Sequence, residues 1–255
     1  MSEDDLSHDA EYVTARTVEA FRENLQRVRS RMASAARSVG RDPDGIRLLP
    51  VSKTVPAERV RLGIAAGITE LGENRVQEAY EKWGALSDLD VRWSVIGNLQ
   101  TNKAKYVARF ADEFQSLDRL RVAEALERRL EKEDRTMDVF VQVNTSNEDS
   151  KYGVPPAELA ELLQQLRQFE RLNVRGLMTL AVFSNDPARV RPCFQLLHSL
   201  RAQMRNESGN DGLSELSMGM SGDYELAIAE GATVVRVGQA IFGSRAVPDS
   251  YYWPS

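Results

Sequence analysis

The sequence is poor in the residues that carry most metal and acid–base chemistry. It has one cysteine, Cys193, and two histidines, His8 and His198, in 255 residues. One cysteine excludes an internal disulfide and is typical of a reducing cytosol. It also cannot build a zinc site with two scattered histidines. His8 lies in a polar stretch and His198 in a helical pattern beside Leu197 and Leu200, so we expect neither to act as a general base. Any chemistry would rest on lysine, arginine, tyrosine, carboxylates or a cofactor.

The sequence also lacks long apolar runs and an excess of basic residues. No apolar stretch approaches the ~20 residues that a transmembrane helix needs. The net charge of -5 argues against a nucleic-acid surface, which requires a basic face. The first five residues, MSEDD, are acidic, unlike a signal peptide. We therefore expect a soluble cytoplasmic protein that binds neither membranes nor nucleic acids.

A regular alternation of short apolar runs and helical patterns fills most of the chain. Residues 1–9 are polar without an apolar period, so they are predicted to be a disordered tail, and residues 11–39 a long amphipathic helix. Strands are predicted at 46–52, 68–71, 91–96, 113–117, 137–144, 174–179, 213–217 and 233–237. Helices are predicted at 56–66, 74–86, 101–110, 118–133, 155–169, 186–205 and 221–230.

Eight short buried strands that alternate with helices favour a parallel sheet with both faces covered. Eight such units in about 200 residues indicate an α/β fold of the (β/α)8 type, a TIM barrel, with an additional N-terminal helix. We expect one domain over residues 10–255. The main alternative is an open doubly wound sheet, but the early Gly-x-Gly-x-x-Gly turn expected of that fold is missing.

Active sites of such barrels lie at the carboxyl ends of the strands. At these ends the sequence places polar side chains, glycines and one isolated amine. They are Lys53; Glu73, Asn74 and Arg75; Gly97, Asn98, Gln100 and Asn102; Asn144 and Ser146; Met178 and Thr179; residues 217–221; and Arg236 and Gly238.

The segments after the last two strands point to a phosphate site, as in many barrels. Ser221 and Gly222 precede a predicted helix, whose first N–H groups can face an anion, and Gly238 permits close approach of the backbone. Taken singly, Ser221 could be only a helix N-cap and Gly238 only a turn residue. Their joint position favours phosphate.

Lys53 directly follows the first predicted strand, 46–52. A lysine at a strand end is commonly just solvated, but in a barrel mouth its amine would be partly desolvated, which favours the neutral nucleophile. Strand one neighbours strand eight in a closed barrel, so the predicted phosphate site would be adjacent. An imine-forming lysine beside a phosphate site is what pyridoxal phosphate requires.

Arg236 would face the same cavity. It could pair with an acid on the rim, such as Asp223 or Glu225, or it could contact the pyridine nitrogen of the cofactor. A charged arginine there would keep that nitrogen unprotonated, because two cations disfavour each other at one site. The ring would then be a weaker electron sink, which disfavours transamination and fits racemisation or simple custody of the cofactor.

Six segments spread over nearly the whole chain carry a family resemblance. They are PVSK at 50–53, GENRVQE at 72–78, IGNLQTNK at 96–103, GLMT at 176–179, LSMGMSGD at 216–223 and VRVGQAIFG at 235–243. With these motifs the sequence resembles the pyridoxal phosphate homeostasis proteins, the YggS/PROSC family. The resemblance implies a barrel like the N-terminal domain of alanine racemase, with pyridoxal 5'-phosphate held as a Schiff base on Lys53. It also implies intracellular vitamin B6 homeostasis and cofactor supply, without an established catalytic activity.

The expected cofactor-binding residues are Lys53, Asn74, Met218, Ser221, Arg236, Gly238 and Gln239, with no metal site and no catalytic residue; Met218 could instead belong to the core. Two positions depart from the family pattern. Ser94 stands where the family usually has histidine, so any role of that histidine is in doubt here. Gln239 stands where the family often has threonine or serine, so a backbone contact to phosphate would survive but a hydroxyl contact would not.

Two functions of different classes compete. The first is a carrier and regulator of pyridoxal phosphate, with PLP-dependent apoenzymes as possible partners. The second is an amino-acid racemase, which needs a second acid–base group on the opposite face of its substrate. The resemblance to racemases of this fold implies that this group is a tyrosine from a separate β domain of the partner subunit. We expect no such domain here. The carrier, as a monomer and without enzymatic activity, is therefore favoured. A phosphosugar-type barrel enzyme without cofactor is a third possibility.

Overall fold

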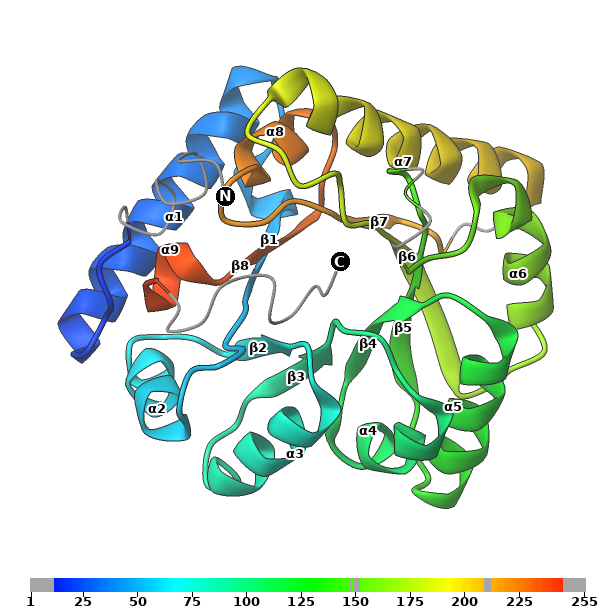
Figure 1. Ribbon diagram of the computed structural model, residues 1–255, viewed down its shortest axis with the longest axis horizontal. Helices are drawn as coiled ribbons and strands as arrows, with labels where there is room; N and C mark the ends of the chain where they lie inside the picture. Colours follow the sequence, from blue (N-terminus) through cyan, green and yellow to red (C-terminus); the bar gives the residue numbers. More distant parts are fainter. Residues whose placement is uncertain (1–11, 147, 149–151, 209–211, 245–255) are drawn as a thin grey trace.

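The computed structural model describes residues 12–146, 148, 152–208 and 212–244. The predicted tail at 1–9 lies outside these residues. Within them the chain forms eight strands, seen along the barrel in Figure 1. Their bounds are β1 (Arg47–Pro50), β2 (Glu70–Glu73), β3 (Arg92–Val95), β4 (Glu113–Leu117), β5 (Met137–Gln142), β6 (Leu172–Met178), β7 (Glu215–Ser217) and β8 (Val234–Val237).

The strands form one parallel sheet in the order β1-β8-β7-β6-β5-β4-β3-β2. First and last strands in the sequence are neighbours, with Leu49 opposite Arg236. An isolated bridge between Val51 and Gly72 joins β1 to β2, so the ring of strands is nearly closed. The predicted (β/α)8 barrel is confirmed, and the open doubly wound sheet is excluded.

Helices cover the outside of the barrel. They are α1 (Val18–Ser38), α2 (Ala57–Ala65), α3 (Val76–Ala85), α4 (Ala104–Phe110), α5 (Leu120–Lys132), α6 (Leu159–Leu166), α7 (Pro187–Ser208), α8 (Tyr224–Ala229) and α9 (Gln239–Phe242), with short 3-10 turns η2 (Pro43–Gly45), η3 (Thr101–Lys103) and η4 (Pro156–Glu158). None of them, within the described ranges, is long and apolar enough to span a bilayer.

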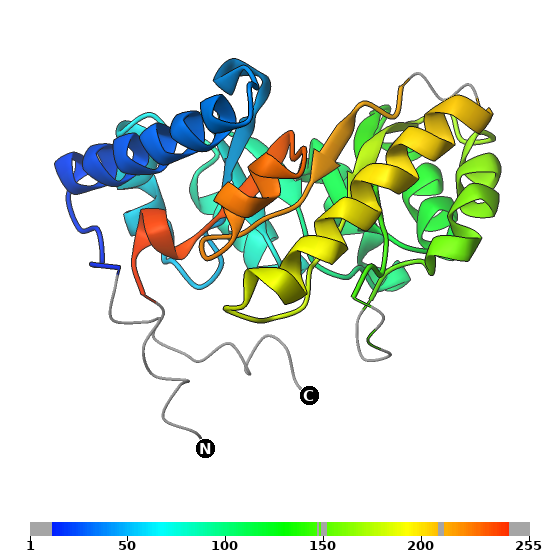
Figure 2. The same ribbon diagram turned by 90° about the horizontal axis from the view of Figure 1, so that it is seen from above.

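The predicted N-terminal helix exists but begins later than expected. Its N-cap is Thr17, whose side chain accepts a hydrogen bond from the Ala20 N–H. The chain before it is not helical, and the carbonyl of Tyr12 accepts a hydrogen bond from the Ser244 N–H at 3.1 Å. The helix α1 then packs beside α8 and α9, as the side view shows (Figure 2).

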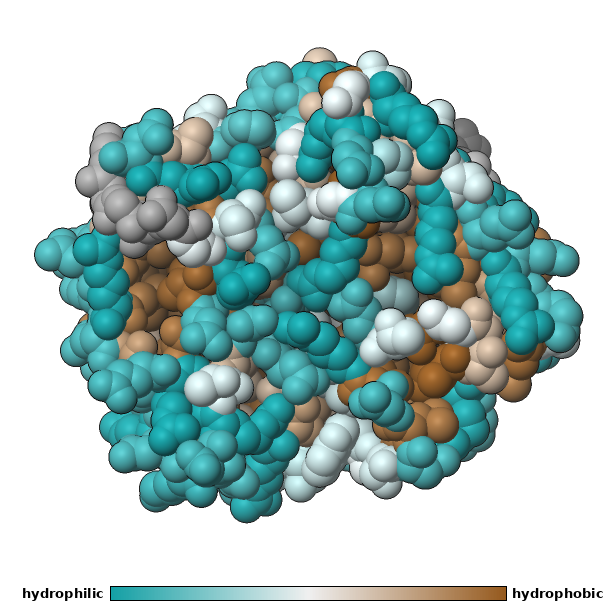
Figure 3. All heavy atoms as spheres, turned by 180° about the vertical axis from the view of Figure 1, so that it is seen from behind, coloured by the Kyte–Doolittle hydropathy of each residue, from teal (hydrophilic) through white to brown (hydrophobic). Residues whose placement is uncertain are grey.

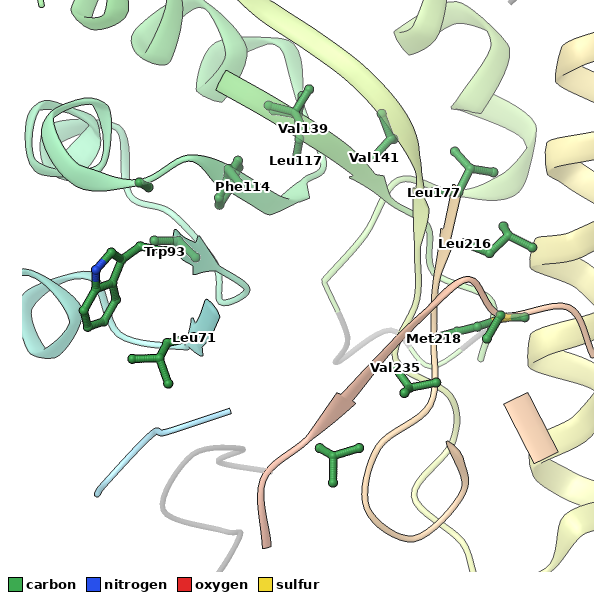
Figure 4. Packing of buried hydrophobic residues seen from close by; sticks show 14 of the residues in the cluster. Leu71, Trp93, Phe114, Leu117, Val139, Val141, Leu177, Leu216, Met218 and Val235 are labelled. Atoms are coloured by element: carbon green, nitrogen blue, oxygen red, sulfur yellow. The ribbon is translucent and has the colours of Figure 1, made fainter. Parts of the chain in front are cut away.

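The apolar core has two shells because successive side chains of a strand point to opposite faces. The outer shell lies between the sheet and the helices and includes Leu71, Trp93, Val139 and Leu216 (Figure 4). The inner shell fills the barrel with four fully buried side chains, those of Leu49, Phe140, Met178 and Val234.

The end of the barrel where the strands begin is hydrophilic across its centre (Figure 3). Arg47, the first residue of β1, lies 2.8 Å from Glu70 and 2.7 Å from Glu113. Burial raises the pKa of Glu70, while the Arg47 guanidinium opposes that shift. Charged groups therefore close this end, and the opposite end carries the candidate site.

Candidate functional site

Lys53 lies in the turn just after β1, with 7% of its surface exposed. The end of β1 is held on both sides. The Val51 N–H donates to the Val237 carbonyl at 2.9 Å, and the Ser52 N–H donates to the Gly72 carbonyl at 3.0 Å. The neighbouring strands thus fix the backbone from which the Lys53 side chain extends.

The serine and glycine of the predicted phosphate site meet in space. The Ser221 hydroxyl accepts hydrogen bonds from the N–H groups of Gly238 at 3.2 Å and Ala240 at 3.5 Å. The helix α9 that begins there was not predicted. The Ser221 hydroxyl therefore faces the start of α9, and the expectation that a helix starts at residue 221 is wrong, since α8 begins at Tyr224 after the N-cap residue Asp223.

This serine–glycine pair lies on the same rim as Lys53. A side-chain carbon added to Gly238 would lie 3.1 Å from the carbonyl oxygen of Val51, two residues before Lys53. Glycine at 238 therefore keeps the two segments in close contact. The predicted adjacency of the amine and the anion-binding segment agrees with this geometry.

Arg236 is 3% exposed and points into the barrel from β8. Its Nη1 donates to the Ser217 hydroxyl at 2.6 Å and its Nη2 to the Thr179 carbonyl at 2.8 Å. Burial lowers the pKa of Arg236 to about 10, and Asp223 partly offsets that effect, so the guanidinium is charged at neutral pH. Among the described residues it makes no direct ion pair: Glu225 binds Arg31, and Asp223 accepts the Met220 N–H. Asp223 therefore acts on Arg236 only through its charge and not as the direct rim partner that the alternative expects.

The other predicted site residues are placed unequally. Asn74 is half-buried between β2 and α3. Its backbone carbonyl oxygen packs against Gly97, and a side-chain carbon added to Gly97 would lie only 2.0 Å from that oxygen. Gln239 is the first residue of α9 and half-buried. The Met218 side chain belongs to the outer shell of the core (Figure 4). Strand alternation turns it away from the barrel interior, so only the backbone of Met218 could meet a ligand.

A chain of buried polar side chains inside the barrel was missed from the sequence. The Ser217 hydroxyl donates to Gln115 Oε1 at 2.6 Å, and Gln115 Nε2 donates to Glu113 Oε1 at 2.6 Å. Ser94, at the position where the family resemblance predicts a histidine, donates to the same carboxylate oxygen at 2.8 Å. This series of hydrogen bonds thus leads from Arg236 to Glu113, and Ser94 is part of it.

A second buried cluster lies behind Lys53, on the helix side of the sheet, and was also missed. Lys82 of α3 places its Nζ 2.7 Å from Glu73 Oε1 and 2.7 Å from Glu78 Oε1. Burial raises the pKa of Glu73 to about 7, against the opposing effect of Lys82. Glu73 Oε2 has no hydrogen-bond partner.

The sequence and fold of this chain match those of known proteins. The family model of the alanine racemase N-terminal domain matches residues 17–246. A pyridoxal phosphate homeostasis protein of Aquifex aeolicus is 43% identical over 223 residues, which cover 88% of this chain and 97% of that protein. The chain belongs to the pyridoxal phosphate homeostasis protein family.

Other known proteins are similar to this chain in sequence, in fold, or in both. The pyridoxal phosphate homeostasis protein of Escherichia coli K12 is 39% identical, covering 87% of this chain and 95% of that protein. PipY of Synechococcus elongatus, solved with PLP bound, has 37% identity and a TM-score of 0.78 over 88% of this chain and 100% of its own. Alanine racemase of Corynebacterium glutamicum, at 16% identity and a TM-score of 0.64, covers 92% of this chain and 64% of its own, and shows the fold alone.

Proposed function

We propose that this protein binds pyridoxal 5'-phosphate as a Schiff base on Lys53 and keeps it available in the cytoplasm for vitamin B6 homeostasis and cofactor supply. One observation carries the proposal. Lys53 is nearly buried and lies on the same rim as Ser221, whose hydroxyl accepts the Gly238 N–H; paired strands β1 and β8 bring the two segments together. The PLP-bound structure of PipY, a relative of this chain, supports it.

The residues of the rim fit this cofactor. Lys53 would supply the nitrogen of the C=N bond, and the Ser221 hydroxyl with the N–H groups of Gly238, Gln239 and Ala240 would bind the phosphate. Arg236 would face the pyridine nitrogen with a charge that resists its protonation. The bound cofactor would supply an aldehyde and an aromatic ring able to delocalise charge.

We further propose that the protein is a monomeric carrier rather than an enzyme, with PLP-dependent apoenzymes as recipients. The names of its relatives support a role in homeostasis. The alternative is an amino-acid racemase, because alanine racemases have the same barrel fold. An assay on L- and D-alanine with the PLP-loaded protein separates the two. The carrier predicts no racemisation above that of free PLP, and sustained turnover would establish the enzyme.

Binding through Lys53 is tested with the Lys53→Ala variant. Titration of each protein with PLP, followed by its visible absorbance, should give a protein-bound yellow species for the wild type and none for the variant. Lys105→Ala, on the outer helix α4, is the matched control and should bind as the wild type does. Equal uptake by the Lys53 variant would refute the assignment, and a colourless wild type would favour a barrel enzyme without cofactor.

A further inference from the structure

We propose that Glu73, Glu78 and Lys82 form a clamp that fixes the peptide bonds on both sides of Lys53 and so positions its amine for Schiff-base formation. This inference rests on the proposed function, because it assigns positioning residues to the same lysine. Lys82 and Glu78 contact the backbone around Lys53 from the helix side of the sheet, and Glu73 holds the Ser52 hydroxyl and the Lys82 ammonium.

The clamp holds the chain immediately before and after Lys53. The Lys82 ammonium donates to the Ser52 carbonyl at 2.6 Å, which fixes the peptide bond that precedes Lys53. Glu78 Oε1 accepts the Thr54 N–H at 2.6 Å, which fixes the peptide bond that follows it. The Ser52 hydroxyl also donates to Glu73 Oε1 at 2.6 Å. Both peptide groups that flank the lysine are therefore bound to side chains.

The Lys82 ammonium has no spare hydrogen-bonding capacity. It has three N–H donors, and they meet Ser52, Glu73 and Glu78 at 2.6–2.7 Å. Lys82 is 6% exposed and Glu73 is fully buried. A buried charge is stabilised only when it is paired and hydrogen-bonded, so the ammonium and the two carboxylates hold one another in a single arrangement.

The backbone of the clamped turn is in a conformation that needs such support. Thr54 has φ of 68°, a left-handed conformation that is an outlier for a β-branched residue. Conformations of this kind persist only where the surrounding structure enforces them, and they concentrate at functional sites. The bond from Thr54 N–H to Glu78 supplies that enforcement at the residue next to Lys53.

Schiff-base formation depends on the position of the amine. The neutral Nζ of Lys53 attacks the aldehyde carbon of pyridoxal phosphate, a C=N bond forms, and the aldehyde oxygen leaves as water. The phosphate contributes affinity through the segment around Ser221 and Gly238, which does not touch the clamp in any described contact. Loosening the clamp should therefore slow bond formation without weakening phosphate recognition.

The test compares Glu78→Ala with Glu81→Ala, the same change one position before Lys82 on an exposed part of α3. Each protein is mixed rapidly with PLP, and the rate of the absorbance change reports bond formation. Affinity for pyridoxine 5'-phosphate, which has an alcohol in place of the aldehyde, is measured by calorimetry. We expect Glu78→Ala to slow bond formation about tenfold or more through misplacement of the amine, with unchanged affinity for pyridoxine phosphate. Glu81→Ala should change neither quantity.

A conservative variant sharpens the test. Glu78→Gln keeps an acceptor oxygen for the Thr54 N–H and should restore most of the rate. Glu78 is partly exposed, so its variants should fold. Lys82→Met is a less suitable test, because it leaves two carboxylates unpaired and the protein could then fail to fold.

A wild-type rate in Glu78→Ala, or a parallel loss of rate and of pyridoxine phosphate affinity, would overturn the clamp. If Lys53→Ala still forms the bond, the proposed function itself is refuted at this residue. If Lys53→Ala loses the bond but the Glu78 variants form it at the wild-type rate, the clamp is refuted and the proposed function stands.

Discussion

The Nη1 of Arg236 on β8 lies 2.6 Å from the hydroxyl of Ser217 on β7. The same hydroxyl donates to Gln115, which in turn donates to the buried carboxylate of Glu113. Every donor in this series points away from Arg236 and toward Glu113. The positive charge beneath the rim is therefore linked through two neutral side chains to a negative charge deep in the barrel, and this series holds the guanidinium in its orientation.

Ser217→Ala should destabilise the protein. The change leaves Arg236 Nη1 and Gln115 Oε1 buried without these partners, which costs about 1–3 kcal/mol. Urea unfolding should show a lower midpoint at an unchanged m-value. Ser199→Ala, on an exposed part of α7, should stay within about 0.5 kcal/mol of the wild type. Equal losses in the two variants would show that the series contributes nothing.

Glu73 should make stability depend on pH. Burial raises its pKa from 4.5 to about 7, so the folded state binds the proton more tightly than the unfolded state. The resulting stabilisation is fully present below pH 4.5 and is lost as the pH rises through 7. Glu73→Gln keeps an acceptor for Ser52 and Lys82 but cannot ionise. The free energy of unfolding, measured from about pH 5 to pH 8, should therefore fall less steeply in the variant. Identical slopes would contradict the burial of an ionisable group here.

Ser221→Ala should weaken phosphate recognition selectively. Loss of one hydrogen bond to a charged group costs about 1.5–3 kcal/mol, which is roughly a tenfold or larger loss of affinity for PLP. Pyridoxal, which has no phosphate, should bind both proteins equally. A calorimetric comparison of the two ligands checks this, with Ser199→Ala as the matched control. If affinity for pyridoxal falls as much as affinity for PLP, Ser221 does not act on the phosphate.

Met218→Leu tests the placement of that side chain in the outer shell of the core. Leucine has a similar volume, so the change should cost less than about 1.5 kcal/mol of stability. PLP affinity should be unchanged, because the side chain lies on the helix side of the sheet. A marked loss of affinity with little loss of stability would place Met218 at the ligand instead.

Position at a strand end was enough to identify the rim residues from the sequence. Lys53 and Gly238 each follow an apolar run, Arg236 lies one residue before the end of such a run, and parallel strands bring such ends to one edge. Helix α9 could not be predicted in the same way, because four residues are too short to show a 3.6-residue period. Its position after β8 is nonetheless what brings the Ala240 N–H to Ser221.

Side-chain direction was harder to predict than position. Ser217 and Met218 are adjacent at the end of β7, and a shift of one residue exchanges the faces they occupy. The interior series left a usable signal, since Glu113 and Gln115 stand two apart in a short strand and must share a face. Lys82 left none, because a lysine within a helix is normally solvated, and only the packing of α3 on β2 buries it.

Borohydride reduction of the PLP-loaded protein, followed by peptide mass mapping, shows directly whether Lys53 carries the cofactor. Reduction makes the C=N bond permanent, so the modified residue can be identified. If Lys53 holds the cofactor, a pyridoxyl phosphate label will be found on Lys53 and will disappear in Lys53→Ala. A label on another lysine of the wild type, such as Lys82 or Lys103, or undiminished labelling of the variant, would contradict it.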